Sequence, residues 1–261
     1  MSGYLHGYLP EEQQRLVDQA LFWRDSLILK QSSFQLGDQL LEVGCGVGAV
    51  LGVLGQAFPG LALHGIDFAE SQLGFARKHL GALGLQAELK QADALSLPYP
   101  EKRFDAVWMM WFLEHVSDPV AALKEARRVL RPQGSLTAIE VDYRLLRPIT
   151  PDPAIEYFLA RFCELFNRHG RCDTGTRLEG WMKEAGLADI KASPLPFKLQ
   201  GAEGIEYLLA FMEPTLADMK ALPGADAGLL DEGLSRFRGL AQRPSEGILV
   251  EIHKVSARKA P

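Results

Sequence analysis

The chain has few cysteines, no strongly basic segment and no long apolar run. Its 261 residues include three cysteines, and its formal net charge is −5. These cysteines have neither metal-ligand spacing nor the even number of a disulfide framework, so we expect no bound metal and a reducing, cytoplasmic location. Nucleic-acid binding requires a basic stripe, and a membrane-spanning helix requires about 20 apolar residues. The sequence therefore predicts neither a nucleic-acid partner nor a membrane partner.

The composition is that of a globular α/β protein. Hydrophobic residues make up 47% of the chain and charged residues 23%, which leaves ample material for a core. Strand-like and helix-like segments alternate along most of the chain, which indicates a parallel, doubly wound sheet. The expected strands are a first one ending at Glu42, then 61–67, 86–93, 104–111, 135–141, 190–196 and 247–257. The expected helices are 10–33, 48–57, 70–83, 118–130, 153–169, 176–185 and two within 202–241.

The last third of the chain predicts an inserted cap. The two helices within 202–241 are too much material for a simple crossover between strands. We expect an N-terminal arm and lid helix at 1–36, a core at 37–200, a helical cap at 201–244, and a final core strand with a tail at 245–261. The apolar stripe of the helix at 10–33 could pack on the main body or form a homodimer contact.

The segment after the first strand is the most informative. Gly44, Gly46 and Gly48 stand at alternate positions, and glycines let the backbone turn sharply and approach a ligand closely. The helix that follows would point its free N–H groups at that ligand. Glu42 precedes the glycines, and a carboxylate there disfavours a pyrophosphate. It favours a ligand with a cationic ammonium and sulfonium, namely S-adenosylmethionine.

A dinucleotide is the rival ligand for this loop. The pattern Gly44-x-Gly46-x-x-Ala49 satisfies a relaxed dinucleotide fingerprint, and Asp67 lies about 20 residues on, where a ribose-binding acid belongs. A purely structural turn is a third interpretation. The loop alone leaves all three open.

Polar residues at the ends of the next strands supply further candidates, because a ligand of an open α/β sheet lies outside the carboxyl ends of its strands. Asp67 and Phe68 end the second strand, where a carboxylate could accept both ribose hydroxyls and a ring could lie on a base. Asp93 and Ala94 end the third, where a carboxylate and a backbone N–H suit the polar edge of a base. Met110 lies at the end of the fourth.

Several motifs together resemble class I S-adenosylmethionine-dependent methyltransferases over about residues 38–142. They are Glu42-Val-Gly-Cys-Gly-Val-Gly, Asp67, Ala92-Asp93-Ala94, Phe104-Asp105, Leu113-Glu114-His115 and Val129-Leu130-Arg131-Pro132-x-Gly134. The arm Tyr4-x-His6-Gly7-Tyr8 is similar to that of a small-molecule subgroup of this family. The resemblance implies a Rossmann-like sheet of seven strands whose last strand is antiparallel, with a variable cap that decides the substrate.

The resemblance also implies roles at the cofactor. Gly44 and Gly46 would lie near the methionine part, Asp67 on the ribose, and Asp93 and Ala94 on the adenine, while Tyr8 would close over the cofactor. S-adenosylhomocysteine would be the product. The expected cofactor-binding set is Tyr8, Glu42, Gly44, Cys45, Gly46, Asp67, Phe68, Asp93, Ala94 and Met110.

Methyl transfer from a sulfonium is a direct displacement, so the protein mainly aligns the reactants in a dry site. A phenol, amine or carbon nucleophile can also need a base, which contributes roughly 10²–10⁴-fold. The candidates for a catalytic base are His115, Glu140, Asp142 and Tyr143, and no spacing selects among them. The aromatic helix at 153–169 predicts a pocket for a small, apolar or aromatic acceptor methylated at O, N or C, although the helix could equally be packing.

Two other functions fit the same sheet. A nicotinamide-dependent oxidoreductase is disfavoured by Glu42, by Asp93 and by the lack of a Tyr-x-x-x-Lys pair after the fifth strand. A binding module that keeps the cofactor fold without turnover is disfavoured because every expected cofactor position is intact.

Overall fold

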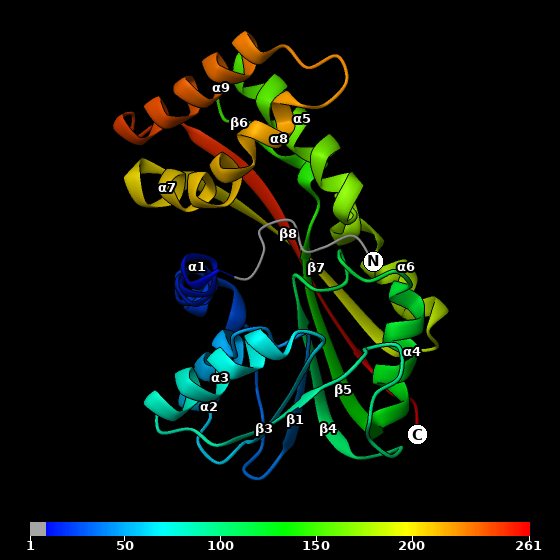
Figure 1. Cartoon of the computed structure of the whole chain (residues 1–261). Helices are drawn as coiled ribbons and strands as arrows, with labels where there is room; N and C mark the ends of the chain where they lie inside the picture. Colours follow the sequence, from blue (N-terminus) through cyan, green and yellow to red (C-terminus); the bar gives the residue numbers. More distant parts are fainter. Residues whose placement is uncertain (1–8) are drawn as a thin grey trace. The chain divides into compact units, whose positions relative to one another are not determined.

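The computed structural model describes residues 9–261, whose strands form one eight-stranded mixed sheet (Figure 1). The strand order is β3-β2-β1-β4-β5-β8-β6, and β7 pairs with β8. β1 pairs in parallel with β2 and β4, β2 with β3, and β4 with β5. The first five strands are β1 (Gln39–Val43), β2 (Ala62–Asp67), β3 (Ala87–Gln91), β4 (Phe104–Met110) and β5 (Leu130–Val141). The others are β6 (Arg147–Pro148), β7 (Ala188–Gln200) and β8 (Gly247–Arg258).

The chain divides into two compact units. The sheet unit contains the described residues up to Glu140 together with Arg177–Ser193 and Lys254–Pro261, and the helical unit contains Val141–Thr176 and Pro194–His253. The helices that begin in the sheet unit are α1 (Pro10–Phe22), a π-helix at Arg24–Ile28, α2 (Ala49–Ala57), α3 (Glu70–Ala82) and α4 (Pro119–Val129). Those that begin in the helical unit are α5 (Pro153–His169), α6 (Thr174–Glu184), α7 (Gly201–Met212), α8 (Leu216–Lys220) and α9 (Ala227–Gly239). Short 3₁₀ turns lie at Tyr143–Leu145, Glu213–Thr215 and Leu240–Gln242.

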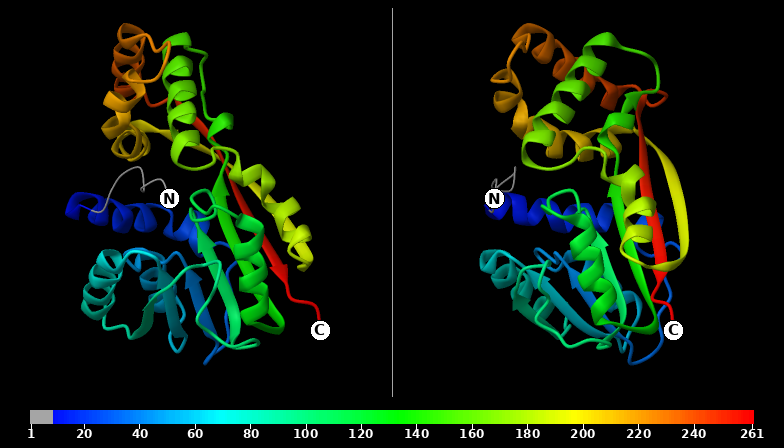
Figure 2. Two further views of the ribbon diagram at one scale, coloured as in Figure 1. Left: turned by 45° about the vertical axis from the view of Figure 1, so that its right-hand side comes forward. Right: turned by 90° about the vertical axis from the view of Figure 1, so that its right-hand side faces the viewer.

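Local sequence explains where these helices start. The Asp118 side chain accepts a hydrogen bond from the Ala121 amide and Pro119 occupies the first turn of α4, an arrangement that satisfies an otherwise unpaired donor. Asp152 caps α5 in the same way, through the amides of Ala154 and Ile155. Two of the sheet unit's helices, α2 and α3, lie on one face of the sheet and α4 on the other (Figures 1 and 2). β4 is almost entirely buried between these layers.

The doubly wound parallel sheet with an antiparallel last strand is confirmed, but the number of strands differs. Seven strands were expected and eight are present, because Arg147 and Pro148 pair antiparallel with Leu249 and Ile248 of β8. A two-residue strand has no periodicity from which it could be read. The order of the parallel strands reverses between β1 and β4, so the switch point of the sheet, where ligands bind in such folds, lies there.

The continuous helix expected at 10–33 is wrong. α1 ends at Phe22 and the chain continues as a π-helix at Arg24–Ile28. Beyond this point the helix does not resume, and the buried ammonium of Lys254 donates hydrogen bonds to the carbonyl oxygens of Leu27, Ile28 and Lys30. These carbonyls bond to a lysine from β8 instead of to amides one turn further along a helix.

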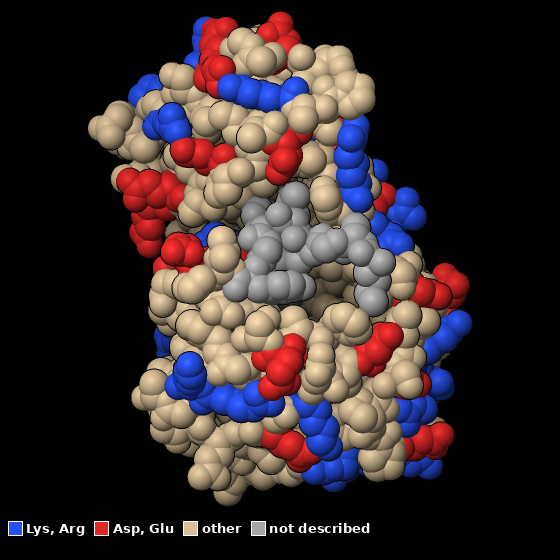
Figure 3. Space-filling view, in the orientation of Figure 1, with Lys and Arg blue, Asp and Glu red and all other residues tan. Residues whose placement is uncertain are grey.

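The expected domain boundaries stay a prediction. The structure groups the helices at 201–239 with the segment Val141–Thr176, which the sequence assigned to the core. None of the helices within residues 9–261 is long and apolar enough to cross a membrane. On the face shown in Figure 3, acidic and basic side chains are interspersed.

Candidate functional site

The glycine loop after β1 folds over the carboxyl end of β2. The backbone N–H groups of Gly44 and Cys45 both donate to the Ile66 carbonyl at 2.9 Å, and the Gly46 N–H donates to Asp67 Oδ2 at 2.9 Å. Gly44 has φ +75° and Gly46 has φ +49°, a left-handed region that glycine adopts without steric cost. The loop and Asp67 therefore form one hydrogen-bonded structure at the switch point.

Gly44 and Gly46, the first two glycines of the loop, have different roles. A Cβ at Gly44 would lie 2.2 Å from Cδ2 of Phe112, whereas a Cβ at Gly46 would meet nothing within 4 Å. Gly44 is therefore required by the ring that covers it, while Gly46 leaves room for a ligand to approach the backbone. Gly48 precedes α2 and supplies no side-chain cap to the first turn of that helix.

Glu42 lies on β1 beneath this loop and is 3% exposed. Its Oε2 atom has no hydrogen-bond partner among the described residues. Burial raises the pKa of the Glu42 carboxyl well above its usual range, opposed by a hydrogen bond from the Leu51 backbone and assisted by the charge of Asp67. A buried carboxyl oxygen without a partner is unfavourable. An ammonium group bound at the loop could donate a hydrogen bond to this oxygen. The Glu42 carboxyl group therefore fits a ligand that carries an ammonium.

Asp67 ends β2, and Phe68 follows it directly. Asp67 Oδ1 accepts from the Ala69 amide at 2.9 Å while Oδ2 accepts from Gly46. Burial raises the pKa of Asp67, and its backbone hydrogen bonds oppose that rise. Each carboxyl oxygen retains a second lone pair for a hydroxyl group. The Phe68 ring is 57% exposed, which is unusual for a large apolar side chain and leaves it open to stack on a base.

The remaining predicted cofactor residues differ in exposure. Asp93 follows β3, is exposed, and accepts from the Leu95 amide at 2.9 Å, while Ala94 is buried. Met110 is buried at the end of β4. Cys45 is buried with its pKa raised well above the usual range, by burial first and by Glu42 and Asp67 next, so it is an unreactive, space-filling side chain. Tyr8 lies outside the described residues.

The turn after β4 is conformationally unusual. Trp111 has φ +48°, which costs a non-glycine residue about 1–3 kcal/mol. Its amide donates to the Ile139 carbonyl at 2.9 Å, and its ring lies 6.5 Å from that of Trp23. The next two amides, of Phe112 and Leu113, donate to Glu140 Oε1 at 2.9 and 2.7 Å. β5 therefore holds this turn both through its backbone and through a side chain.

Glu140 and His115, two of the base candidates, lie near this turn. Glu140 is completely buried, and burial, followed by the nearby Glu114 carboxyl, raises its pKa well above the usual range. His115 is exposed, with Nε2 3.3 Å from Glu114 Oε1. Of these two candidates, only His115 offers its side chain to solvent.

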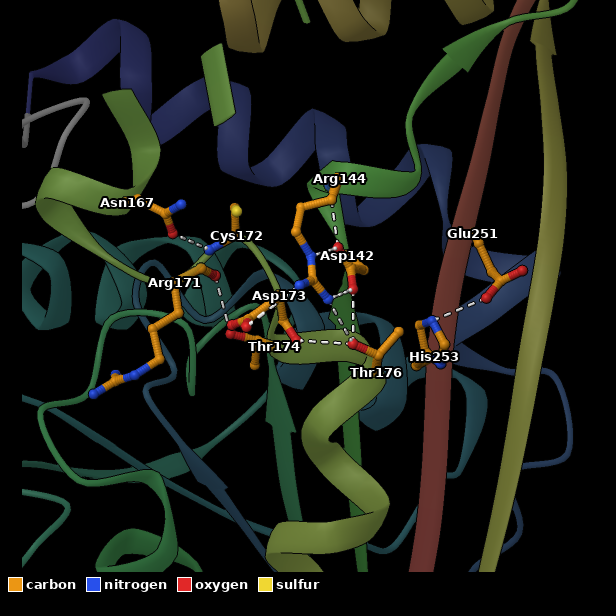
Figure 4. Close-up of polar contacts among 10 residues, drawn as sticks. All are labelled: Asp142, Arg144, Asn167, Arg171, Cys172, Asp173, Thr174, Thr176, Glu251 and His253. Atoms are coloured by element: carbon orange, nitrogen blue, oxygen red, sulfur yellow. Dashed lines mark hydrogen bonds and ion pairs between the residues drawn. The ribbon is translucent and has the colours of Figure 1, made fainter. Parts of the chain in front are cut away.

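Asp142, the third candidate, belongs to the helical unit (Figure 4). Its carboxylate accepts from Arg144 Nε at 2.9 Å, from Arg144 Nη2 at 2.6 Å and from Thr176 Oγ1 at 2.7 Å. Burial alone would raise the pKa of Asp142, but together these hydrogen bonds outweigh burial and hold the pKa below its usual range. Gly175 makes this arrangement possible, since a Cβ there would lie 2.9 Å from the Val141 carbonyl carbon. A fully bonded carboxylate of low pKa is a poor proton acceptor.

Tyr143, the fourth candidate, is buried in an aromatic cluster of the helical unit. Its ring centroid lies 4.6 Å from that of Phe166, 5.7 Å from Phe162 and 5.8 Å from Phe211. The phenylalanines of α5 are themselves buried. These contacts show packing around Tyr143, the alternative that the sequence left open for this helix.

The structure thus brings together, within the sheet unit, the predicted residues of the glycine loop and of the β2 end, and it adds Phe112 over Gly44. Neither Trp111 nor Phe112 is among the site residues predicted from the sequence. No pattern there signals a left-handed tryptophan or a carboxyl group that binds two consecutive amides. Within residues 9–261, no group of three or more His, Cys, Asp or Glu side chains is arranged to hold a metal ion.

Known proteins match the chain over the same region. The matching family model is described as a methyltransferase domain and covers residues 41–138. The chain is 29% identical to a 27-O-demethylrifamycin SV methyltransferase of Amycolatopsis mediterranei (strain S699), over 97% of this chain and 89% of that protein. It is 30% identical to a ubiquinone biosynthesis O-methyltransferase of Methylococcus capsulatus (strain ATCC 33009 / NCIMB 11132 / Bath), over 69% of this chain and 79% of that protein.

A solved structure shares the fold. Phosphoethanolamine N-methyltransferase 2 of Haemonchus contortus, in complex with S-adenosyl-L-methionine, matches with a TM-score of 0.55 at 17% identity. The match covers 95% of this chain and 52% of that one, so the chain spans about half the length of that protein. At this identity the likeness concerns the fold alone.

Proposed function

The chain belongs to the class I S-adenosylmethionine-dependent methyltransferases, and we propose that it methylates an O, N or C atom of a small, apolar or aromatic metabolite. Two relatives support a small-molecule acceptor, because one is named for 27-O-demethylrifamycin SV and the other for ubiquinone biosynthesis. The apolar or aromatic character of the acceptor stays a prediction from the aromatic sequence of α5, because the contacts of its phenylalanines with Tyr143 are those of packing. A homodimer and a cytoplasmic location stay predictions.

The observation that carries the cofactor assignment is the buried Glu42 Oε2 atom, which has no partner among residues 9–261 and lies beneath the glycine loop. We assign the ammonium of the methionine part to this end of the loop. The open backbone at Gly46 admits that part, and Asp67 receives the ribose hydroxyls. Phe68 would stack on the adenine, and Asp93 and Ala94 would bind its polar edge. A dinucleotide would instead bring a pyrophosphate to this loop, and phosphate oxygens carry no hydrogen that could bond the unpartnered Glu42 Oε2 atom.

Bound S-adenosylmethionine supplies a methyl group on a sulfonium, which is already a good leaving group. The chain therefore has to hold the cofactor rigidly and exclude water from the reacting atoms. The glycine loop is rigid because three of its amides are bonded to Ile66 and Asp67. Phe112 covers Gly44 and excludes water from that part of the loop.

Where the acceptor must lose a proton, His115 is the residue we assign to that step. Its side chain is exposed, and Glu114 Oε1 lies 3.3 Å from Nε2, so the neighbouring carboxyl group can orient the imidazole. Glu140 is enclosed and bonded to two amides, and Asp142 is bonded to Arg144 and Thr176. Neither carboxyl group is placed to receive a proton from an acceptor.

The test is calorimetric titration with S-adenosylhomocysteine, and with NADH in parallel, of the wild type and of Glu42→Gln and Asp67→Asn variants. The control is Glu101→Gln, which removes an exposed acid that precedes β4, at the opposite end of the parallel strands. We expect micromolar binding of S-adenosylhomocysteine by the wild type and the control. Both site variants should weaken it at least tenfold, because each removes a charge-assisted contact of about 1.5–3 kcal/mol.

Binding of NADH in place of S-adenosylhomocysteine would return the glycine loop to its dinucleotide interpretation. Equal affinities in the wild type and both site variants would move the cofactor away from this loop. The acceptor class is tested separately, by methyl transfer to a panel of phenols, amines and apolar metabolites. Transfer confined to a protein or nucleic-acid acceptor would overturn the proposal of a small metabolite.

A further inference from the structure

Glu140 is enclosed in the sheet unit and makes contacts that a general base would not need. The carboxyl group is completely buried, and a single oxygen, Oε1, accepts from the amides of both Phe112 and Leu113. These amides belong to a turn, where no strand partner is available to them. A buried amide without an acceptor is strongly unfavourable, so the turn depends on this side chain.

The turn that Glu140 holds is strained. Trp111, the residue before the two bonded amides, has a left-handed backbone at φ +48°. Such a conformation persists in a residue with a bulky side chain only where the surroundings impose it. Here the surroundings are the Ile139 carbonyl, which accepts from the Trp111 amide at 2.9 Å, and Glu140, which fixes the next two residues. Both belong to the end of β5.

The consequence of the turn lies on the glycine loop. The ring of Phe112 rests so closely on Gly44 that a Cβ on that glycine would come within 2.2 Å of Cδ2, 2.7 Å of Cγ and 2.9 Å of Cε2. β1 and β4 are neighbours at the switch point of the sheet, so the ring joins the loops that follow these two strands. If Phe112 moved away, Gly44 would lose this packing contact and the glycine loop would be less restrained.

We infer that Glu140 is a positioning residue: its buried carboxyl group holds the Trp111–Leu113 turn so that Phe112 covers Gly44 and keeps the glycine loop in its cofactor-binding form. This assignment rests on the proposed function, because it gives the loop a cofactor to bind. It differs from the role of catalytic base that the sequence left open for Glu140. A base would affect proton removal from the acceptor and leave cofactor affinity unchanged, whereas a positioning residue sets that affinity.

The test compares Glu140→Gln with Glu140→Leu. Glutamine keeps an oxygen that can accept from both amides, while leucine has a similar volume and no acceptor. The first readout is S-adenosylhomocysteine affinity by calorimetry. We expect Glu140→Gln to bind within threefold of the wild type and Glu140→Leu to bind at least tenfold more weakly. If the carboxylate acted only through its charge or as a base, the glutamine side chain would not restore the affinity.

The second readout does not require the cofactor. Hydrogen–deuterium exchange of a peptide containing Phe112 and Leu113 should be slow in the wild type and in Glu140→Gln, and fast in Glu140→Leu. Slow exchange in all three proteins overturns the inference even if the wild type binds S-adenosylhomocysteine. If the wild type does not bind S-adenosylhomocysteine, the proposed function fails, and the exchange data still show whether Glu140 holds the turn. If Glu140→Gln and Glu140→Leu weaken S-adenosylhomocysteine binding equally, the inference that Glu140 is a positioning residue is also overturned.

A second pair of variants avoids the buried carboxyl group, in case Glu140→Leu does not fold. Phe112→Ala removes the half-buried ring and should weaken S-adenosylhomocysteine binding at least fivefold. Gly44→Ala introduces the clash with the ring, and the double variant Gly44→Ala/Phe112→Ala relieves it. We therefore expect the double variant to bind more tightly than Gly44→Ala alone. Strictly additive losses, or unchanged binding by Phe112→Ala, would show that the ring does not control the loop.

Discussion

Replacing Lys254 by methionine should destabilise the sheet unit, because this lysine joins β8 to the N-terminal helices. Lys254 is 6% exposed, and its Nζ donates to the carbonyls of Leu27 at 3.0 Å and Ile28 at 3.3 Å. It also donates to the Lys30 carbonyl and lies 5.1 Å from the centre of the Trp108 ring. Methionine preserves the length and apolar volume of the side chain but leaves these carbonyls without a donor.

The magnitude follows from two opposing contributions. Three buried carbonyls that lose their donor cost about 1–3 kcal/mol each. Against this, burial lowers the pKa of Lys254 from 10.5 to about 8, helped by the charge of Lys30. This depression corresponds to about 3 kcal/mol of unfavourable charge burial at neutral pH, which methionine removes. Taking the middle of the range for the three carbonyls, about 6 kcal/mol, we expect a net loss of about 3 kcal/mol for Lys254→Met.

Urea unfolding followed by tryptophan fluorescence measures this loss, since Trp23 and Trp108 both lie in the sheet unit. With an m-value of about 3 kcal/mol/M, the midpoint should fall by roughly 1 M. The control is Lys78→Met on the exposed face of α3, for which we expect a change within about 0.5 kcal/mol. A midpoint of Lys254→Met equal to that of the control would refute the role assigned to Lys254.

The same lysine predicts a pH dependence. Its folded-state pKa of about 8 lies below the unfolded value of 10.5, so the unfolded chain binds more protons between these values. The free energy of unfolding should therefore rise as pH increases from about 8 to about 10.5, and the charge-burial cost is fully present below that window. Lys254→Met should lack this rise, and a rise of equal size in both proteins would assign it to other groups.

Three further predictions concern individual residues of the two units. Gly46→Ala should retain most of its stability, losing only about 1–2 kcal/mol to its left-handed backbone, but should weaken S-adenosylhomocysteine binding in calorimetry; unchanged affinity would show that no ligand approaches Gly46. Asp142→Asn should lower the free energy of unfolding in urea by about 1–3 kcal/mol. Because the folded-state pKa of Asp142 is lowered, the wild type should lose this advantage as pH falls below about 4. A stability difference that stays constant down to pH 2 would contradict the ion pair. Once an acceptor is found, His115→Asn should reduce turnover by roughly 10²–10⁴-fold with unchanged S-adenosylhomocysteine affinity, and full activity would exclude His115 as the base.

The sequence predicts those parts of the fold that local patterns control. The alternation of strand-like and helix-like segments predicted the parallel sheet, and the helix starts expected at 118 and 153 lie within one residue of the observed starts of α4 at Pro119 and α5 at Pro153. The end of the helical segment at Ile28 could not be predicted, because the lysine that donates to the Leu27 and Ile28 carbonyls is more than 200 residues away. The strand at Arg147–Pro148 is likewise defined only by its partner in β8.

The candidate site shows the same limit. Glycines and acids at strand ends are visible in sequence because their residue types are themselves the signal. The role of Glu140 depends on the orientation of its side chain, which the sequence does not reveal. In the structure the side chain points into the sheet unit, toward the amides of Phe112 and Leu113. Its neighbour but one, Asp142, is enclosed by Arg144 and Thr176 of the helical unit. Two acids at the end of one strand were equal candidates in sequence, and their hydrogen-bond partners distinguish them.

These partners also explain why the end of β5 carries two acids that we do not assign to catalysis. Glu140 binds the turn after β4, and Asp142 binds Thr176 in the first turn of α6, so each carboxyl group fixes one unit internally. A methyl donor that is already activated demands alignment more than acid–base chemistry. The buried acids at this strand end therefore contribute to the alignment of the reactants, because they hold the backbone in place. A substitution that keeps hydrogen-bond acceptance, such as Glu140→Gln, should consequently be better tolerated than one that keeps the charge but shortens the reach, such as Glu140→Asp. The reverse order of S-adenosylhomocysteine affinities would show that the charge, and not the hydrogen bonds, matters at this strand end.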